Sequence, residues 1–131
     1  MCLILLGHQY GRCHPDVSGY TGSWYGFGPA SWNLYEHGLG YLSIYNHLHG
    51  FEEVKTKAGK RQYNNRMFGG SDENPPFMML PVDMALDWDP DYKKHVHYYD
   101  RNRTELRHDC VKAWVKLTQL GCSGLAKESN F

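Results

Sequence analysis

The chain opens with six consecutive apolar residues, Met1 to Leu6, followed by Gly7 and His8. This run is too short to cross a membrane, and it lacks the basic flank of a signal peptide. It predicts a short helix that starts at once, has no polar face before Gly7 and ends at Gly11. Because no side of such a helix is favourably exposed to water, we expect protein to cover it on every side.

The composition indicates one small domain without charge-driven partners. A chain of 131 residues is long enough for a single modest domain. Lys plus Arg and Asp plus Glu both number 14, and this balance argues against a nucleic-acid partner or a membrane surface. Aromatic residues make up 15% of the chain. Their large flat side chains must be buried against other protein surface, which need not all belong to this chain. The four cysteines lack metal-binding spacing, so we expect reduced thiols in a reducing compartment.

The middle of the chain is expected to hold loops, one helix and one hairpin. Gly, Pro and Ser are frequent in residues 12–29, which predicts loop with definite turns. Apolar residues recur every three to four positions in residues 30–48, which is typical of a helix. Residues 51–68 predict two polar strands joined by a solvated turn at 57–60. Residues 71–76 have the composition of a linker.

Two short helices are expected next. The first is predicted to begin at about Asp83, directly after the run FMMLPV. The second is predicted from Asp89-Pro90-Asp91, which supplies an N-cap, a proline at the first helical position and a first-turn acid. This second helix is expected to run to about Tyr99.

A longer helix is predicted over residues 103–120. Asn102 and Glu105 have the spacing of a capping box, and Gly121 is typical of a helix end. The apolar positions expected on one face are Leu106, Cys110, Ala113, Trp114 and Leu117. Together these patterns predict a mainly α protein with one small β-hairpin.

Taken singly, the residues that could carry chemistry are ambiguous. A histidine at the end of an apolar helix, such as His8, is more often a hydrogen-bonded core residue than a metal ligand. Asp83 after Leu-Pro is typical of a helix cap, and a lone Trp24 is typical of packing. The remaining histidines are scattered without a ligand spacing. Only the combination of these residues supports a functional argument.

Three segments together resemble the class I haem peroxidases of the cytochrome c peroxidase and ascorbate peroxidase type. They are GHQYGRCHPDVSGYTGSW, FMMLPVDMALDWDPDY and AWVKLTQLG, which occur in the family's order and cover nearly the whole chain. The first two segments together are specific, whereas the third alone is not. The resemblance implies the proximal helical half of the peroxidase fold, with residues 1–131 as one domain and 51–76 as a hairpin and linker insertion. The MMLP run and the polar hairpin favour the cytochrome c peroxidase branch.

By this resemblance His8 is the proximal ligand of a haem b iron. Asp83 is then the carboxylate that accepts the ligand's other ring N–H, and Trp24 is the tryptophan that lies against the imidazole. The same carboxylate can accept the indole N–H, so that one acid orients both rings. An ionised carboxylate there increases electron donation to iron and favours cleavage of the peroxide O–O bond. In the cytochrome c peroxidase branch this tryptophan holds an oxidising equivalent; in the ascorbate branch it does not, and both alternatives stay open here.

The resemblance also implies contacts with the haem propionates. His14 and Ser18 fall where the family hydrogen-bonds a propionate, and Arg12 is expected to neutralise charge nearby. The alternatives are a surface histidine, a turn serine and a solvated arginine. Val17 stands where ascorbate peroxidases carry the arginine that holds ascorbate, which argues against that substrate. The chain also departs from the family pattern at three positions, namely Gly7, Gln9 and Tyr10.

The family's distal Arg, Trp and His, which act on bound peroxide, lie on a helix well before the proximal ligand. Only seven residues precede His8, so we expect an obligate protein partner. In one hypothesis another chain supplies the distal half, and the assembled protein reduces hydrogen peroxide at a shared haem. In the other, the chain is a non-catalytic accessory subunit of a larger, mitochondrial complex. Haem carriage or electron relay is a third hypothesis between these two.

Overall fold

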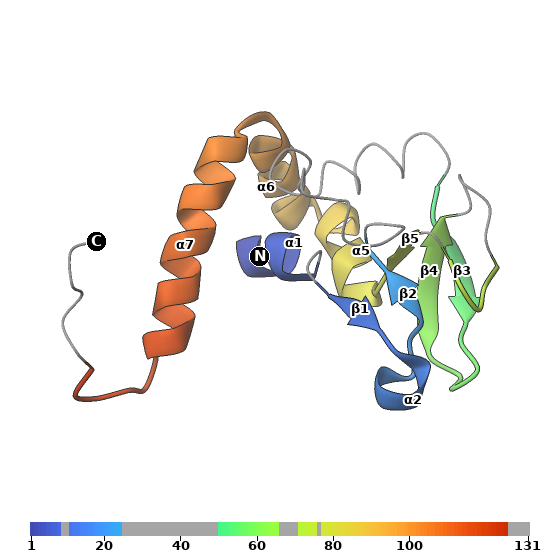
Figure 1. Ribbon diagram of the computed structural model, residues 1–131. Helices are drawn as coiled ribbons and strands as arrows, with labels where there is room; N and C mark the ends of the chain where they lie inside the picture. The colour runs from blue at the N-terminus through green and yellow to red at the C-terminus, as the bar shows by residue number, and fades with distance from the viewer. Residues whose placement is uncertain (9–10, 25–49, 66–70, 76, 126–131) are drawn as a thin grey trace.

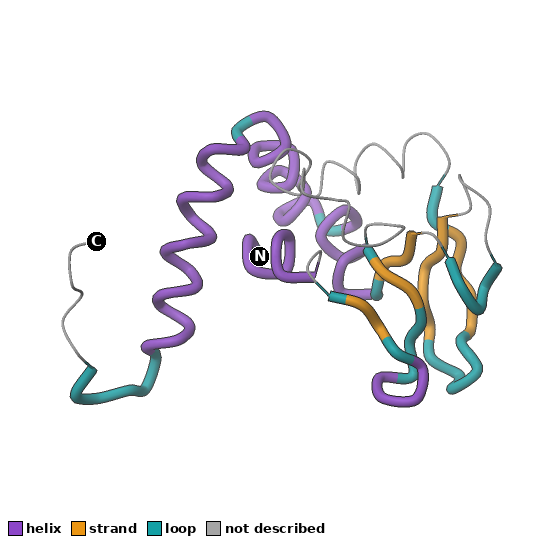
Figure 2. The backbone as a smooth tube through the Cα atoms, viewed as in Figure 1, coloured by secondary structure: helices purple, strands orange, loops and turns teal. Residues whose placement is uncertain are grey.

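The computed structural model describes residues 1–8, 11–24, 50–65, 71–75 and 77–125 (Figure 1). The helices are α1 (Cys2–Gly7), α2 (Pro15–Ser18), α5 (Pro81–Trp88), α6 (Pro90–Arg101) and α7 (Arg103–Gln119). The strands are β1 (Arg12–Cys13), β2 (Gly22–Ser23), β3 (Glu52–Lys55), β4 (Arg61–Asn65) and β5 (Phe77–Met79). The strands gather at one side of the molecule and α7 stands at the other (Figure 2). The predicted fold class, mainly α with a small β-hairpin, is confirmed.

The segment predicted as loop after residue 11 contains short regular elements, so this prediction is wrong in part. β1 and β2 pair antiparallel, with α2 between them. Pro15 starts α2 at its first position, and Gly19 ends it in the left-handed region at φ 73°. The first helix also differs, because α1 ends at Gly7 rather than at Gly11. The helix predicted over 30–48 lies outside the described residues.

The predicted hairpin is present as β3 and β4, with Glu53 opposite Tyr63. Its tip at residues 57–60 is exposed, as expected of a solvated turn. The prediction did not include a strand at residues 77–79. These residues form β5, which pairs with β4 and adds a third strand to the sheet. The following helix therefore begins at Pro81, where a proline tolerates the first helical position. The last predicted residues of the second strand, 66–68, lie outside the described residues.

The polar residues of β4 are buried. Gln62 and Asn65 are 0% exposed, although their residue types predict a solvated strand. Gln62 exchanges two hydrogen bonds with the backbone of Thr21, accepting from its N–H at 3.0 Å and donating to its carbonyl at 2.8 Å. Gln62 also donates to the side chain of Asn64 at 2.7 Å. These hydrogen bonds offset the cost of burying the polar side chains. They also hold the hairpin against the segment that precedes Trp24.

The two helices after α5 follow the sequence signals closely at their starts. The Asp89 side chain accepts from the backbone N–H groups of Asp91 and Tyr92, which confirms the predicted N-cap of α6. The capping box predicted for α7 is wrong: the side-chain amide of Asn102 donates instead to the carbonyl of Tyr98, at 2.8 Å. That bond closes the end of α6 rather than the start of α7. α6 extends to residue 101, two residues beyond the prediction.

The core lies between α5, the three-stranded sheet and α6. Its most deeply buried apolar residues are Met78, Met79, Met84, Leu86, Val96 and Leu106. α1 packs against α7, which extends away from the sheets (Figure 1). Leu106 and Cys110 on α7 are buried as predicted, whereas Trp114 is 61% and Leu117 is 55% exposed. Among the described residues, none of the helices combines the length and hydropathy that a membrane crossing requires.

Gly22 should be essential for folding of the segment before Trp24. Its φ of 101° suits only glycine, and a Cβ there would lie 2.8 Å from the Pro75 ring. We expect Gly22→Ala to lower the free energy of unfolding by about 2–4 kcal/mol, from backbone strain together with overpacking. The measurement is urea unfolding followed by circular dichroism.

The matched control is Gly59→Ala, which has a similar left-handed requirement (φ 76°) but open space around the new Cβ. It should cost only about 1–2 kcal/mol, the backbone part of the effect. Equal losses in the two variants would contradict the steric argument at Gly22.

Candidate functional site

One buried carboxylate organises the candidate site. Asp83 is 1% exposed, and its Oδ1 lies 2.7 Å from Nδ1 of His8. Its Oδ2 accepts the indole N–H of Trp24 at 2.7 Å and the backbone N–H of Leu80, also at 2.7 Å. The predicted pair of hydrogen bonds, in which one carboxylate accepts from both rings, is therefore present. Three donors converge on the carboxylate, as a buried negative charge requires.

Local sequence explains how Asp83 reaches this position. Leu80 is extended (ψ 161°) at the end of β5, and Pro81 fixes the first turn of α5. Asp83 is then the third residue of the helix, from which its side chain can turn back to the Leu80 N–H. It thus acts as a helix cap and as a partner of His8 at once. The sequence pattern presents these roles as alternatives and does not indicate the Leu80 N–H as a third donor.

The histidine and the tryptophan come from different elements. His8 follows α1, and Trp24 follows β2. Their ring centroids are 4.6 Å apart, with planes inclined at 32°. Trp24 is 6% exposed and belongs to the core, so it is a rigid wall for the imidazole. The side chain of His8 is 32% exposed.

The tautomer of His8 follows from its partner. A neutral imidazole beside an ionised carboxylate places its proton on Nδ1, where it donates to Asp83. The opposite nitrogen, Nε2, then carries a free lone pair. No group among the described residues hydrogen-bonds Nε2, and the ring is partly open to its surroundings. A nitrogen lone pair on an oriented, partly exposed imidazole is the donor that a haem iron takes on its proximal side, so these residues fit that group.

The other predicted site residues lie on β1, at the N-cap of α2 and at the end of α2. Arg12 is exposed and its guanidinium is 3.5 Å from the side-chain oxygen of Asn74. His14 is exposed and makes no cap hydrogen bond with its side chain. The Ser18 hydroxyl donates to the carbonyl of His14 at 3.0 Å and accepts from the N–H of Tyr20 at 3.2 Å. Ser18 therefore closes a local turn, and contacts of all three with a propionate stay a prediction.

A buried thiol, that of Cys13, lies near the carboxylate, and no sequence pattern singles it out. Cys13 on β1 is 9% exposed. Burial raises the pKa of the Cys13 thiol, a hydrogen bond with Ser18 offsets part of this effect, and the charge of Asp83 raises the pKa further. Cys13 and Cys122 form no disulfide with another described residue, and the expected reducing compartment stays a prediction. Cys13 thus fills space beside the site as a neutral thiol.

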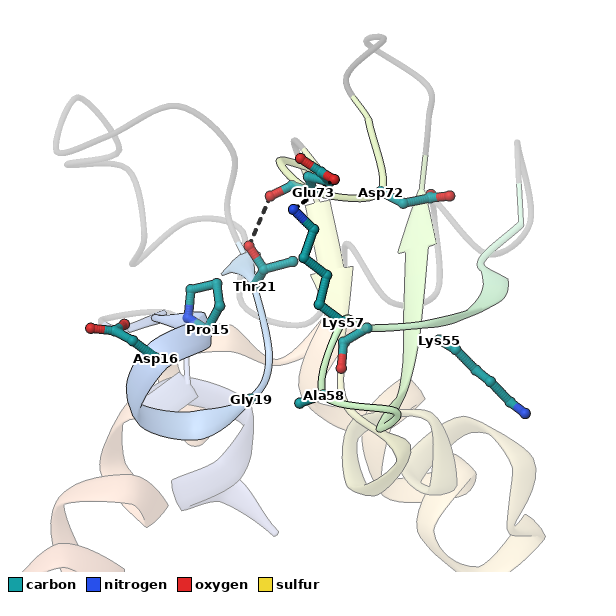
Figure 3. Close-up of a pocket in the computed structure, with 10 residues that line it drawn as sticks. Pro15, Asp16, Gly19, Thr21, Lys55, Lys57, Ala58, Asp72 and Glu73 are labelled. Atoms are coloured by element: carbon teal, nitrogen blue, oxygen red, sulfur yellow. Dashed lines mark hydrogen bonds and ion pairs between the residues drawn. The ribbon is translucent and has the colours of Figure 1, made fainter.

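A cavity of about 640 Å³ lies elsewhere, between α2, the hairpin tip and residues 72–73 (Figure 3). Lys57 and Glu73 form an ion pair at 2.8 Å, and Thr21 donates to the Glu73 carbonyl. The lining carries both signs of charge and contains none of His8, Trp24 or Asp83. It is therefore separate from the candidate site, and nothing in its lining selects one class of ligand.

Several known proteins have sequences similar to that of this chain. No family model matches the chain. The mitochondrial cytochrome c peroxidase of Candida albicans is 39% identical over 120 residues, which cover 91% of this chain and 29% of that protein. That of Aspergillus fumigatus is 33% identical over 129 residues, covering 98% and 31%. That of Cryptococcus neoformans var. grubii is 34% identical over 116 residues, covering 87% and 26%.

The fold, the His8–Asp83–Trp24 arrangement and these similarities place the chain in the class I haem peroxidase family. Within that family, the three relatives named above are cytochrome c peroxidases. The chain spans about 30% of the length of these relatives.

Proposed function

We propose that this chain is the haem-ligating part of a class I peroxidase that reduces hydrogen peroxide. His8 would bind the iron of a haem b through Nε2, with Asp83 and Trp24 as supporting residues. The observation that carries the proposal is the single carboxylate that lies 2.7 Å from both His8 Nδ1 and Trp24 Nε1. A histidine held only for packing needs no buried acid, and a buried acid is costly without such a role.

The haem, when bound, supplies the redox chemistry of peroxide reduction. The residues of this chain then set its proximal environment. Asp83 would hold the proton of His8 on Nδ1, which would leave the Nε2 lone pair available to iron and increase its electron donation. Asp83 also fixes the indole of Trp24 beside the imidazole of His8, with the ring planes inclined at 32°, where the indole would be able to give up an electron. Arg12 and His14, both exposed, would hold the propionates, while the engaged Ser18 hydroxyl contributes the shape of the turn.

Peroxide turnover also needs distal residues, and we propose that a partner polypeptide supplies them. α7 presents three apolar side chains to solvent, Val111, Trp114 and Leu117, at 63%, 61% and 55% exposure. A cluster of this kind on one helix is typical of a surface that another chain covers. The relatives' names include a mitochondrial location, and we propose the same setting here.

Complementation tests this function. Mixing the chain and haem with a polypeptide bearing a distal Arg, Trp and His should produce a Soret band and peroxide-dependent oxidation of reduced cytochrome c. Trp114→Ser should weaken the assembly by about thirtyfold or more, because an aromatic anchor at an interface is worth about 2 kcal/mol or more. The stability of the chain should hardly change, because this side chain is largely exposed.

The control is Lys116→Ser, an exposed charge on the same helix, which should leave the assembly intact. Assembly with a partner that lacks the distal residues, and without haem uptake or turnover, would support the accessory-subunit hypothesis instead. Assembly unaffected by Trp114→Ser would show that the partner does not cover this face of α7.

A further inference from the structure

Tyr63 and Trp88 form an aromatic pair between the core and the surface. Tyr63 on β4 is 6% exposed, whereas Trp88 at the end of α5 is 53% exposed. Their ring centroids are 5.2 Å apart and their planes are inclined at 77°, an edge-to-face contact. We propose that this pair is a second redox site, at which a small phenolic donor delivers electrons that pass inward to Trp24. The inference rests on the proposed function, which supplies the oxidant.

The structure links Tyr63 to Trp24 through few steps. Tyr63 lies directly opposite Met79 in the register of β4 and β5, so both side chains project from the same face of the sheet. Both belong to the buried cluster that also contains Trp24. Met79 is followed by Leu80, whose N–H donates to the Asp83 oxygen that accepts the Trp24 indole. A sulfur-bearing side chain and two short hydrogen bonds, each 2.7 Å, thus join the aromatic pair to the candidate site.

Tyr63 has a proton acceptor in place. Its hydroxyl donates to the Glu53 carboxylate at 2.9 Å, across the hairpin. Burial raises the pKa of Tyr63, and the hydrogen bond and charge of Glu53 raise it further, against a smaller opposite effect of Arg61. The phenol therefore stays protonated at neutral pH and loses its proton only when an electron leaves. A one-electron oxidation without such an acceptor would create a cation in a poorly solvated place.

The proposed steps balance in charge and protons. Oxidised Trp24 takes one electron from Tyr63, and the phenolic proton moves to Glu53, which leaves a neutral tyrosyl radical and a protonated carboxyl group. A phenol at Trp88 then gives one electron to Tyr63 through the indole, Glu53 returns the proton, and the phenol releases its own proton to water. Each cycle oxidises one phenol to its phenoxyl radical. Hydrogen peroxide at the haem is the final electron acceptor and takes two electrons in two cycles.

The first test needs no haem. The chain is oxidised by a photogenerated ruthenium(III) trisbipyridine complex, and radicals are read by electron paramagnetic resonance. The exposed Trp88 should be oxidised and should then take an electron from Tyr63, which becomes the radical. Tyr63→Phe should therefore remove most of the tyrosyl signal and prolong the tryptophan radical, and Glu53→Gln should slow the transfer. The matched control is Tyr92→Phe, a tyrosine that is 49% exposed, which should change little. An unchanged tyrosyl signal in Tyr63→Phe overturns the proposal.

The second test uses the haem-loaded assembly, with the Soret band as a separate measure of haem uptake. Peroxide with a radical trap should label Tyr63 or Trp88, and in Tyr63→Phe the label should shift to Trp24. Trp88→Phe should lower phenol oxidation several-fold with the Soret band unchanged. A Soret band with trapped radical confined to Trp24 in the unaltered protein overturns the relay and leaves the proposed function standing. Absence of a Soret band contradicts the proposed function, and the haem-free test then decides the aromatic pair alone.

Discussion

Replacement of His8 by Ala is expected to abolish haem binding in the assembled protein. The ring nitrogen Nε2 of His8 has a lone pair available for iron, because Nδ1 is engaged by Asp83. His14, at the N-cap of α2, is exposed and is not expected to take its place. The measurement is a haem titration followed by absorption, in which the Soret band of the bound haem should disappear. Added imidazole should restore it in part, because the lost ring leaves a cavity beside Trp24.

Two controls separate ligation from general damage. His95→Ala, an exposed histidine on α6, should leave the titration unchanged. His14→Ala should weaken haem affinity without moving the band, since we propose only a propionate contact there. A Soret band of normal position and intensity in His8→Ala would contradict the assignment of the ligand.

Asp83→Ala should be strongly destabilising. The carboxylate is 1% exposed and receives three hydrogen bonds, so its loss strands the buried indole N–H of Trp24 and the N–H of Leu80. Removing one partner from a buried charged network costs about 3–5 kcal/mol, a large fraction of the stability of a small domain. We expect a large loss of the folded fraction, measured by circular dichroism across a urea series. Haem uptake should fall with it, because His8 loses the group that orients its ring.

The matched control is Asp89→Ala in the same region. Asp89 also accepts two backbone N–H groups, but it is exposed, and loss of such an N-cap costs about 1 kcal/mol. If Asp83→Ala lost no more stability than Asp89→Ala, the carboxylate would not be the organising centre of the site. Asp83→Asn should lie between them, because its amide keeps one acceptor oxygen but presents an N–H₂ group to a neighbour.

Helix starts and the hairpin could be predicted from local signals. Asp89 followed by Pro90 defines the start of α6 within one residue, because both the cap and the proline act through neighbouring backbone groups. Asn102 shows the limit of such patterns. Its side chain reaches the carbonyl of Tyr98 in the preceding helix, a competing bond that the capping-box spacing does not encode.

Features that depend on distant partners could not be derived from composition or periodicity. The polar side chain of Gln62 indicates a solvated strand, yet it is buried because its two backbone partners belong to Thr21, 41 residues away. The same limit applies to the site. His8 and Asp83 are 75 residues apart, and each alone has an ordinary explanation as a core histidine and a helix cap. Only the resemblance of whole segments to the peroxidase family predicted that these two residues interact. The structure shows in addition that the Leu80 N–H donates to the same carboxylate.

The most direct test of the central claim is resonance Raman spectroscopy of the ferrous haem bound to the assembled protein. The claim is that Nε2 of His8 binds iron while Asp83 holds Nδ1. It predicts an iron–nitrogen stretching band that shifts when isotopically labelled histidine is incorporated. In Asp83→Asn the band should move to lower frequency, because a neutral amide draws less on the Nδ1 proton and the iron–nitrogen bond weakens. A band at the same frequency in Asp83→Asn, or one that persists in His8→Ala, would contradict the account.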